Sequence, residues 1–239
     1  MKLDNNLTSV VHGGYNVYGY KLGVIMLETS FPRIPGDIGN ASTFSFPVLY
    51  KTVKDGTPTK VVLNLTKEDL QPFIDAAVEL EQAGVRAITT SCGFLSLFQK
   101  EMSAAVNIPV YTSALVMLPM VSMMVSGKVG VLTANSDTLS PAHFAALGVN
   151  IDDYVIKGLQ HGEMFTNFTV QNWDHVDMDV CRMELMEAAR EITTEHPELR
   201  ALVLECSNMP PYINDIRKAA NIPVFDLVML TEMIVSAAG

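Results

Sequence analysis

The sequence predicts an α/β protein made of two pseudo-symmetric, doubly wound parallel-sheet domains with an active-site cleft between them. Apolar strands alternate with amphipathic helices along the chain, a pattern typical of parallel sheets covered by helices on both faces. The chain also repeats itself. Cys92 and Cys206 each precede a copy of Asn-Ile-Pro-Val, and the differences 206 − 92, 221 − 107 and 223 − 109 all equal 114. We therefore expect a duplication in which each half forms one sheet.

The first half contains four apolar runs that predict strands. They are at residues 22–27, 61–65, 87–90 and 108–111. Helical spacing of apolar residues predicts helices over about 72–83, 95–105 and 115–125. Pro72 suits a first-turn position and Gly84 suits a helix exit. A long loop rich in proline and glycine follows the first strand, from 31 to 40.

The second half repeats this order. Gly130 in its first strand corresponds to Gly23, at an offset of 107. Strands are expected at residues 129–132, 153–156, 201–205 and 224–225. Helices are expected at residues 178–196, 212–220 and 227–238. Cys92 and Cys206 then both lie just after the carboxyl end of a strand, where open α/β sheets bind their ligands.

The composition excludes several partners. The chain has 239 residues and a formal net charge of −10, which argues against nucleic acid or an anionic membrane as partner. No apolar run approaches the roughly 20 residues of a membrane span, and residues 1–8 lack the apolar core of a signal peptide. Three cysteines are few and odd in number, as in a reducing compartment. We expect a cytoplasmic protein that acts on a small molecule, without a metal, since no paired Cys or His spacing is present.

The two matched cysteines are candidates for acid and base. Each is expected near a helix N-terminus, where free N–H groups and the helix dipole lower the pKa of a thiol and attract an anion. Two facing thiols can remove a proton from one side of a carbon and return one to the other side. A purely structural role as buried apolar residues is the alternative, as is a disulfide between Cys92 and Cys206. Cys181 has no counterpart at the 114 offset and is expected to be structural.

The duplicated halves, the two strand-end cysteines and the repeated Asn-Ile-Pro-Val resemble the aspartate/glutamate racemase superfamily. That group includes amino-acid racemases independent of pyridoxal phosphate, hydantoin racemases, maleate isomerases and arylmalonate decarboxylases. The resemblance implies that Cys92 and Cys206 are the acid/base thiols, that no cofactor is needed, and that the protein is a homodimer. It also implies that the last strand or helix crosses back, so that residues 1–112 plus 222–239 form one lobe and 113–221 the other.

The residues after the cysteines depart from the pattern of amino-acid racemases. Cys92 is followed by Gly93-Phe94 instead of Asn-Thr, and Cys206 by Ser207-Asn208 instead of Thr-His. These departures weaken the case for free glutamate or aspartate as substrate. Two cysteines argue against a decarboxylase, since decarboxylases of the superfamily generally keep one.

Ten residues are predicted to contact the substrate. They are Glu28, Thr29, Arg33, Ser91, Gly93, Phe94, Asn135, Ser136, Ser207 and Asn208. The N–H groups of the turns after the cysteines can hold a carboxylate, and Arg33 can grip an anion bidentately or instead pair with Asp37 inside its loop. The strand ends that carry Glu28 and Asn135 face the cleft by resemblance, although loop or helix capping explains them equally well.

The predicted function is a cofactor-independent racemase or epimerase. It inverts a carbon next to a carboxyl or carbonyl group by two-thiol proton transfer, on an amino acid or a derivative. Two alternatives stay open. One is a maleate-type cis–trans isomerase in which one cysteine attacks as a nucleophile. The other is a non-catalytic protein that binds a small acid.

Overall fold

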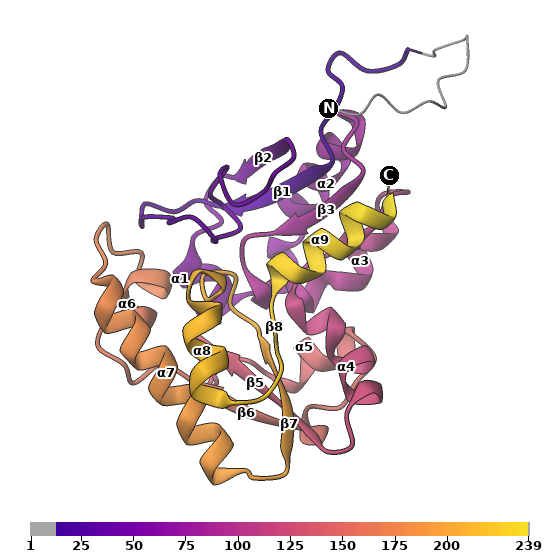
Figure 1. The fold of residues 1–239 in the computed structure, drawn as a ribbon. Helices are drawn as coiled ribbons and strands as arrows, with labels where there is room; N and C mark the ends of the chain where they lie inside the picture. Colours follow the sequence, from indigo (N-terminus) through magenta and orange to yellow (C-terminus); the bar gives the residue numbers. More distant parts are fainter. Residues whose placement is uncertain (1–12, 239) are drawn as a thin grey trace.

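The computed structural model describes residues 13–238 and contains two four-stranded sheets, each wholly parallel (Figure 1). The first has the order β2-β1-β3-β4 and the second the order β6-β5-β7-β8. The first sheet consists of β1 (Leu22–Leu27), β2 (Val48–Val53), β3 (Ala87–Thr90) and β4 (Val110–Tyr111). The second consists of β5 (Lys128–Thr133), β6 (Tyr154–Gly158), β7 (Leu199–Leu204) and β8 (Val224–Phe225). The two orders are identical, which confirms the predicted α/β fold and its repetition. The prediction made for residues 1–8 lies outside the described residues.

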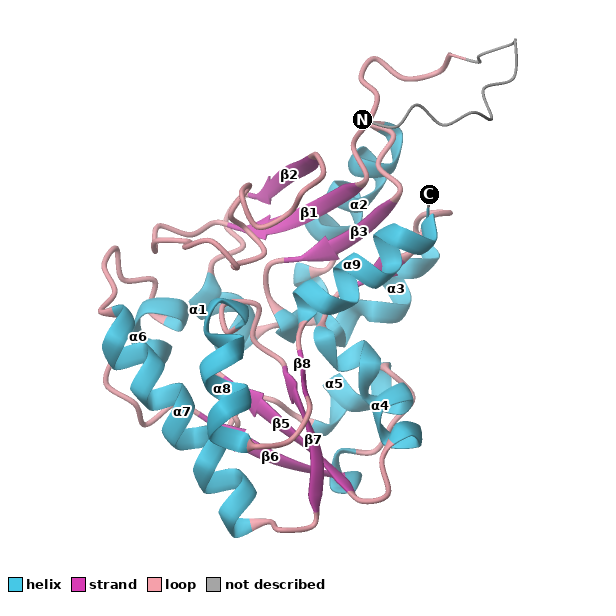
Figure 2. Ribbon diagram, in the orientation of Figure 1, coloured by secondary structure: helices cyan, strands magenta, loops and turns pink. Residues whose placement is uncertain are grey.

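The main helices follow the apolar periodicity that predicted them (Figure 2). They are α2 (Gln71–Gln82), α3 (Gln99–Ala104), α4 (Leu118–Met124), α7 (Met178–Glu195), α8 (Ile213–Ala220) and α9 (Leu227–Ala238). The predicted helices 95–105 and 115–125 each begin with a 3₁₀ turn, η2 (Gly93–Phe98) and η3 (Ala114–Met117). Among the described residues, no helix is long and apolar enough to cross a membrane.

Equivalent glycines let a helix approach the central strand of each sheet. A Cβ added at Gly23 would lie 3.0 Å from Leu80 Cδ1 of α2. A Cβ at Gly130 would lie 2.6 Å from Leu202 Cδ2 and 3.2 Å from Ile192 Cδ1 of α7. All three contacts are closer than side chains ordinarily make, so a larger residue would force its neighbours to move. The 107-residue offset between the two glycines therefore corresponds to the same packing requirement in both lobes.

Residues 61–65 form no strand, which corrects the prediction made for them. They belong largely to a helix, α1 (Pro58–Asn64), because Thr57 caps its N-terminus by accepting a hydrogen bond from the Lys60 N–H, and Pro58 occupies the first turn. The fourth strand of the first sheet is instead β2, which pairs with β1 at the edge of the sheet and was not predicted. The short helices α5 (Pro141–Ala146) and α6 (Phe165–Val170) were also not predicted.

The C-terminal segment divides between the lobes. Strand β8 pairs with β7 in the second sheet, so residues 224–225 do not join the first lobe as the predicted boundary at 222 required. The helix that follows, α9, does return and lies against β3 of the first sheet (Figure 1).

The connection between β1 and β2 differs from its counterpart in the second lobe. The connection between β5 and β6 contains α5, whereas residues 28–47 contain no helix. Asp37 organises this loop: its carboxylate accepts hydrogen bonds from the Gly39 N–H and from Arg33, and its carbonyl accepts one from the Thr43 hydroxyl. The Ser30 N–H donates to Asn172 Oδ1 of the second lobe at 2.8 Å. The loop therefore reaches from the first lobe to the second.

Candidate active site

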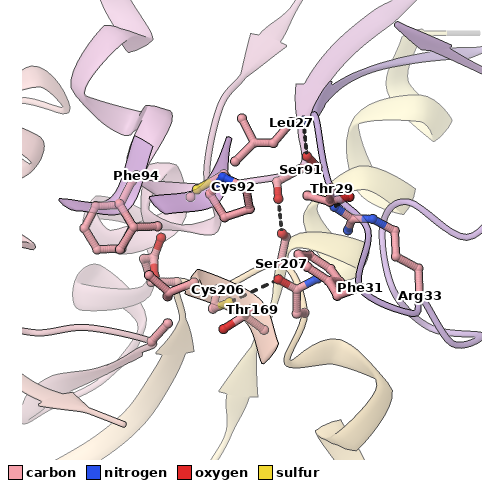
Figure 3. Close-up of a pocket in the computed structure, with 17 residues that line it drawn as sticks. Leu27, Thr29, Phe31, Arg33, Ser91, Cys92, Phe94, Thr169, Cys206 and Ser207 are labelled. Atoms are coloured by element: carbon pink, nitrogen blue, oxygen red, sulfur yellow. Dashed lines mark hydrogen bonds between the residues drawn. The ribbon is translucent and has the colours of Figure 1, made fainter. Parts of the chain in front are cut away.

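One pocket between the two sheets contains both matched cysteines (Figure 3). Cys92 follows β3 of the first sheet and Cys206 follows β7 of the second. The pocket is narrow, with a cavity volume of about 20 Å³. Nine of the residues predicted for the site line it: Thr29, Arg33, Ser91, Cys92, Gly93, Phe94, Cys206, Ser207 and Asn208. The parallel strands thus bring together two thiols that are 114 positions apart in the chain.

Each thiol is held by a tight turn after its strand. Cys92 is extended (φ −152°, ψ 119°) and its carbonyl accepts from the Leu95 N–H at 3.1 Å. The Thr90 hydroxyl also donates to this carbonyl, at 2.9 Å. In the second lobe the Met209 N–H donates to the Cys206 carbonyl at 3.1 Å. All three cysteines of the chain are free and buried, so Cys92 and Cys206 form no disulfide.

Burial raises the pKa of both thiols, which corrects the prediction that the turns would lower it. For Cys92, desolvation is the largest cause and the negative charge of Glu205 raises the pKa further, against an opposing hydrogen bond from the Phe94 N–H. Desolvation and Glu205 raise the pKa of Cys206 in the same way, and the Asn208 N–H opposes them. A single N–H at a 3₁₀ turn is outweighed by the loss of water and by a nearby carboxylate. Both groups are therefore thiols at neutral pH in the empty pocket.

The residue before each cysteine contacts the residue after the other one. The Ser207 hydroxyl donates to the Ser91 carbonyl at 2.6 Å, across the lobes. At the 114 offset, Ser207 corresponds to Gly93 and Ser91 corresponds to Glu205. Glu205 and Gly93 also touch, since a Cβ added at Gly93 would lie 2.2 Å from Glu205 Oε1 and 2.3 Å from its carbonyl oxygen. The two crossed contacts are symmetry equivalents, but only one of them places a carboxyl group in the pocket.

Glu205 was not predicted as a site residue. Its side chain is 1% exposed and lines the pocket. Its Oε2 accepts a hydrogen bond from the Thr133 hydroxyl at 2.8 Å, while its Oε1 is buried without a partner. Burial raises the pKa of Glu205 to about 7. The available signal was its position beside Cys206, at the offset of Ser91.

Arg33 forms the predicted ion pair with Asp37 and also lines the pocket. Its Nη1 lies 2.8 Å from Asp37 Oδ1, and the two side chains are 11% and 4% exposed. Its Nη2 donates to the Thr29 hydroxyl at 3.4 Å, and its buried Nε has no partner. The guanidinium lies over the Phe31 ring, 4.6 Å from the centroid. The loop thus fixes one side of the Arg33 guanidinium, while the Nε–H donates to no described residue.

Asn208 connects Cys206 to this ion pair. The Cys206 thiol donates to Asn208 Oδ1 at 3.6 Å, a distance suited to sulfur. The Asn208 side-chain amide donates to Asp37 Oδ2 at 2.5 Å. Cys206 therefore has a polar acceptor in its protonated form, and no such side-chain acceptor is found for Cys92 among the described residues.

Three of the predicted substrate contacts do not line this pocket. Glu28 accepts from the Asp55 N–H at 2.9 Å. Asn135 accepts from the Asp137 N–H at 2.9 Å, and the Ser136 hydroxyl accepts from the Gln160 amide at 2.8 Å. These side chains organise their own loops, as the capping alternative expected.

The walls of the pocket also include residues of two helices that were not predicted. Pro58 and Val62 come from α1, and Thr169 and Val170 come from α6. Their helices pack together, with the Thr59 hydroxyl donating to the Val170 carbonyl at 2.7 Å. They were missed because neither helix was predicted. Across residues 13–238, no group of three or more His, Cys, Asp or Glu side chains is arranged to hold a metal ion.

Known proteins are similar to this chain in sequence and in fold. Residues 45–231 match the family described as Asp/Glu/Hydantoin racemase. A dimethylsulfoniopropionate lyase of Durusdinium sp. clade D is 31% identical over 230 residues, which cover 92% of this chain and 75% of that protein. Dimethylsulfoniopropionate lyase 3 of Emiliania huxleyi (strain CCMP1516) is 32% identical over 219 residues, 87% of this chain and 57% of the relative. The chain thus spans little more than half the length of the Emiliania protein.

Solved structures agree on the fold. A glutamate racemase isoform from Bacillus anthracis superposes with a TM-score of 0.60 at 18% identity, covering 92% of this chain and 83% of that one. Unliganded arylmalonate decarboxylase superposes with a TM-score of 0.58 at 15% identity, covering 92% and 93% of the two chains. Since the matched segment spans most of the sequence and includes both cysteine turns, the chain belongs to the Asp/Glu/hydantoin racemase family.

Proposed function

We propose that this chain is a lyase that cleaves dimethylsulfoniopropionate, or a closely similar sulfonio carboxylate, with a pocket thiol as the base. The observation that carries the proposal is that Cys92 and Cys206 share one pocket with Arg33. The relatives from Durusdinium and Emiliania, both named dimethylsulfoniopropionate lyases, support the choice of substrate. The pocket supplies the base and a partner for the carboxylate.

The reaction follows from the structure of the substrate. Dimethylsulfoniopropionate carries a carboxylate and a dimethylsulfonium cation separated by two methylene groups. A thiolate removes a proton from the carbon next to the carboxylate, and the electron pair of that C–H bond forms a C=C bond. The C–S bond breaks and its electron pair leaves on sulfur. The products are dimethyl sulfide, acrylate and a protonated thiol, and no oxidant or reductant is involved. Racemisation begins with the same proton removal, so one family site suits either reaction.

Arg33 is the group that binds the substrate carboxylate. It is the only Lys or Arg residue that lines the pocket in the described chain. Its Nε has no hydrogen-bond partner among the described residues, and its Nη2 makes only a long contact with Thr29. A carboxylate can accept from these donors in the parallel arrangement that guanidinium groups favour. The apolar side chains of Leu27, Val62 and Val170 form walls suited to the methyl groups at the other end of the substrate.

The charge of the substrate supplies an activation that the protein's own groups do not. Both thiols have raised pKa values because they are desolvated and lie near Glu205. A sulfonium cation bound beside them in a medium of low dielectric constant lowers those pKa values, since it favours the thiolate. The base is then formed when the correct substrate is bound.

We assign the base to Cys92. The positive charge of Arg33 lowers the pKa of Cys92, whereas the negative charge of Asp37 raises the pKa of Cys206. Asn208 Oδ1 also accepts a hydrogen bond from the Cys206 thiol and so stabilises its protonated form. Cys92 is the easier of the two thiols to deprotonate, and Cys206 is the opposite, protonated partner.

A two-thiol racemase or epimerase is the second candidate. The observation in its favour is that the thiols come from the two opposite lobes, as inversion requires, whereas elimination needs one base. The substrate would be an acid that carries its stereocentre next to a carboxyl or carbonyl group. The reaction is distinguished from elimination by solvent deuterium that enters that position without loss of a leaving group.

The test measures release of dimethyl sulfide by gas chromatography and acrylate by absorbance, with the purified chain and dimethylsulfoniopropionate. We expect release by the wild type and a loss of at least about 100-fold in kcat for Cys92→Ser, the magnitude typical of a general base. Cys181→Ala is the control, because this thiol is buried in α7 away from the pocket and should leave kcat unchanged. No release by the wild type, with deuterium exchange in amino acids or hydantoins, would replace the lyase by the racemase.

A further inference from the structure

Glu205 is the one carboxyl group that lines the pocket among the described residues, and proton transfer as set out above makes no use of it. It is 1% exposed, and its Oε1 has no hydrogen-bond partner. Leaving a buried carboxyl oxygen unsatisfied costs about 1–3 kcal/mol or more. A side chain maintained at that cost calls for a partner from outside the protein.

The pseudo-symmetry of the fold shows that the carboxyl group is not needed to build the turn. Ser91 occupies the equivalent position in the first lobe, and its hydroxyl accepts a hydrogen bond from the Leu27 N–H at 2.9 Å. Glu205 instead accepts a hydrogen bond from the Thr133 hydroxyl, through Oε2 alone. The first lobe therefore forms this turn without a carboxyl group, and the second oxygen of Glu205 has no counterpart there.

The opposite turn makes room for this oxygen. Gly93 corresponds to Ser207, yet any side chain at position 93 would overlap Glu205 Oε1, since even a Cβ would lie 2.2 Å away. Gly93, which directly follows Cys92 in the chain, has no Cβ, and the Glu205 carboxyl group occupies the space that a Cβ would take. The carboxyl group therefore lies between the turns that present the two thiols.

We propose that Glu205 is the residue that recognises positive charge, so that the pocket selects small carboxylates that carry a cationic sulfonium or quaternary ammonium group. The proposal rests on the function proposed above and names the feature of the substrate that the site recognises. Arg33 binds the carboxylate, Glu205 lies against the onium centre, and the reacting methylene groups lie between them. A carboxylate of the same shape without the onium charge leaves Glu205 without its partner and binds less tightly.

The test compares two ligands that have the same shape and differ in the onium charge. The ligand 3-(trimethylammonio)propionate carries the onium charge, and 4,4-dimethylpentanoate has carbon in place of nitrogen. We expect calorimetry at pH 8 to give a Kd for the onium ligand at least about tenfold lower than the Kd for 4,4-dimethylpentanoate. Glu205→Gln, which keeps size and shape, should bring the ratio of the two Kd values close to one. Glu28→Gln is the control, because Glu28 also follows a strand but does not line the pocket, and the ratio should stay as in the wild type.

A second measurement varies the pH. Protonation of Glu205, whose pKa is raised to about 7, should weaken binding of the onium ligand as the pH falls from 8 to 5.5, while binding of the ligand without the onium charge changes much less. The other charged or titratable groups that line the pocket are Cys92, Cys206 and Arg33, with Asp37 behind Arg33. Without an onium ligand the raised pKa values keep both thiols protonated over this range, and both ligands carry the same carboxylate toward Arg33. Because a bound onium group also favours a thiolate, the pH series is repeated with Glu205→Gln, and the part of the pH dependence that this variant loses is the part due to Glu205.

The outcomes separate this inference from the proposed reaction. Equal binding of the two ligands by the wild type, or an unchanged ratio in Glu205→Gln, would overturn the role of Glu205 even if dimethyl sulfide is released. A tenfold ratio that depends on Glu205 would support that role even if no dimethyl sulfide is released, and only the reaction would then need revision.

Discussion

Replacing Gly93 by alanine should damage both the stability and the activity of the protein. The added Cβ would lie 2.2 Å from Glu205 Oε1, 2.3 Å from the Glu205 carbonyl oxygen and 2.9 Å from Cδ. The carboxyl group can rotate away, but the carbonyl belongs to the backbone that follows β7 and cannot. The turn that holds Cys92 must therefore shift relative to Cys206. Overpacking of this kind costs about 1–3 kcal/mol, which lowers Tm by about 2–12 °C in a chain of this size.

The assay combines thermal unfolding with turnover and includes two controls. Gly23→Ala introduces a contact of 3.0 Å with the flexible end of Leu80, remote from the pocket, and should lose some stability but keep its kcat. Adding Glu205→Ala to Gly93→Ala removes the clash with the carboxyl group but not the one with the carbonyl. The double variant should therefore regain only part of the stability lost by Gly93→Ala. A Gly93→Ala protein with wild-type Tm and wild-type turnover would refute the close packing of the two turns.

Two further predictions concern buried charges. Glu205 has a folded-state pKa of about 7 against an ordinary value of 4.5, so the carboxyl group favours folding when protonated, and this contribution is lost as the pH rises through 7. Urea unfolding at pH 5 and pH 8 should show the stability of Glu205→Gln rising relative to the wild type by about 2–3 kcal/mol over that range, and a constant difference would contradict the raised pKa. Arg33→Met leaves the buried Asp37 carboxylate without its cation, so we expect a loss of about 3–5 kcal/mol in unfolding free energy. Arg33→Met/Asp37→Asn should recover much of that loss, and failure to do so would show that the ion pair is not the cause.

Much of the fold was predictable because the chain contains two versions of it. The 114-residue offset between Cys92 and Cys206 placed both thiols at strand ends, and the identical strand orders of the two sheets confirm the duplication. Residues 61–65 were predicted wrongly because their apolar, β-branched composition suits a buried strand as well as a buried helix face. Thr57 and Pro58 distinguish the two, since together they form a helix start.

The electrostatics of the site were harder to predict. Sequence position correctly indicated that N–H groups approach both sulfurs, but it gave no measure of desolvation, which determines the direction of the pKa shifts. Glu205 was overlooked for a related reason. A glutamate at a strand end is usually solvated, and only the three-dimensional contact with Gly93 shows that this one is enclosed. The roles of the nine pocket residues in binding stay predictions until a ligand is measured.

The crossed contacts between the halves have a consequence for how a ligand can enter. A perfectly repeated pair of lobes would present the same chemistry from both directions, and a molecule could bind head-first or tail-first with equal ease. Here a serine and a glycine follow the two cysteines, and a carboxyl group stands on one side only. This carboxyl group, together with Arg33 from the first lobe, gives the cavity a direction.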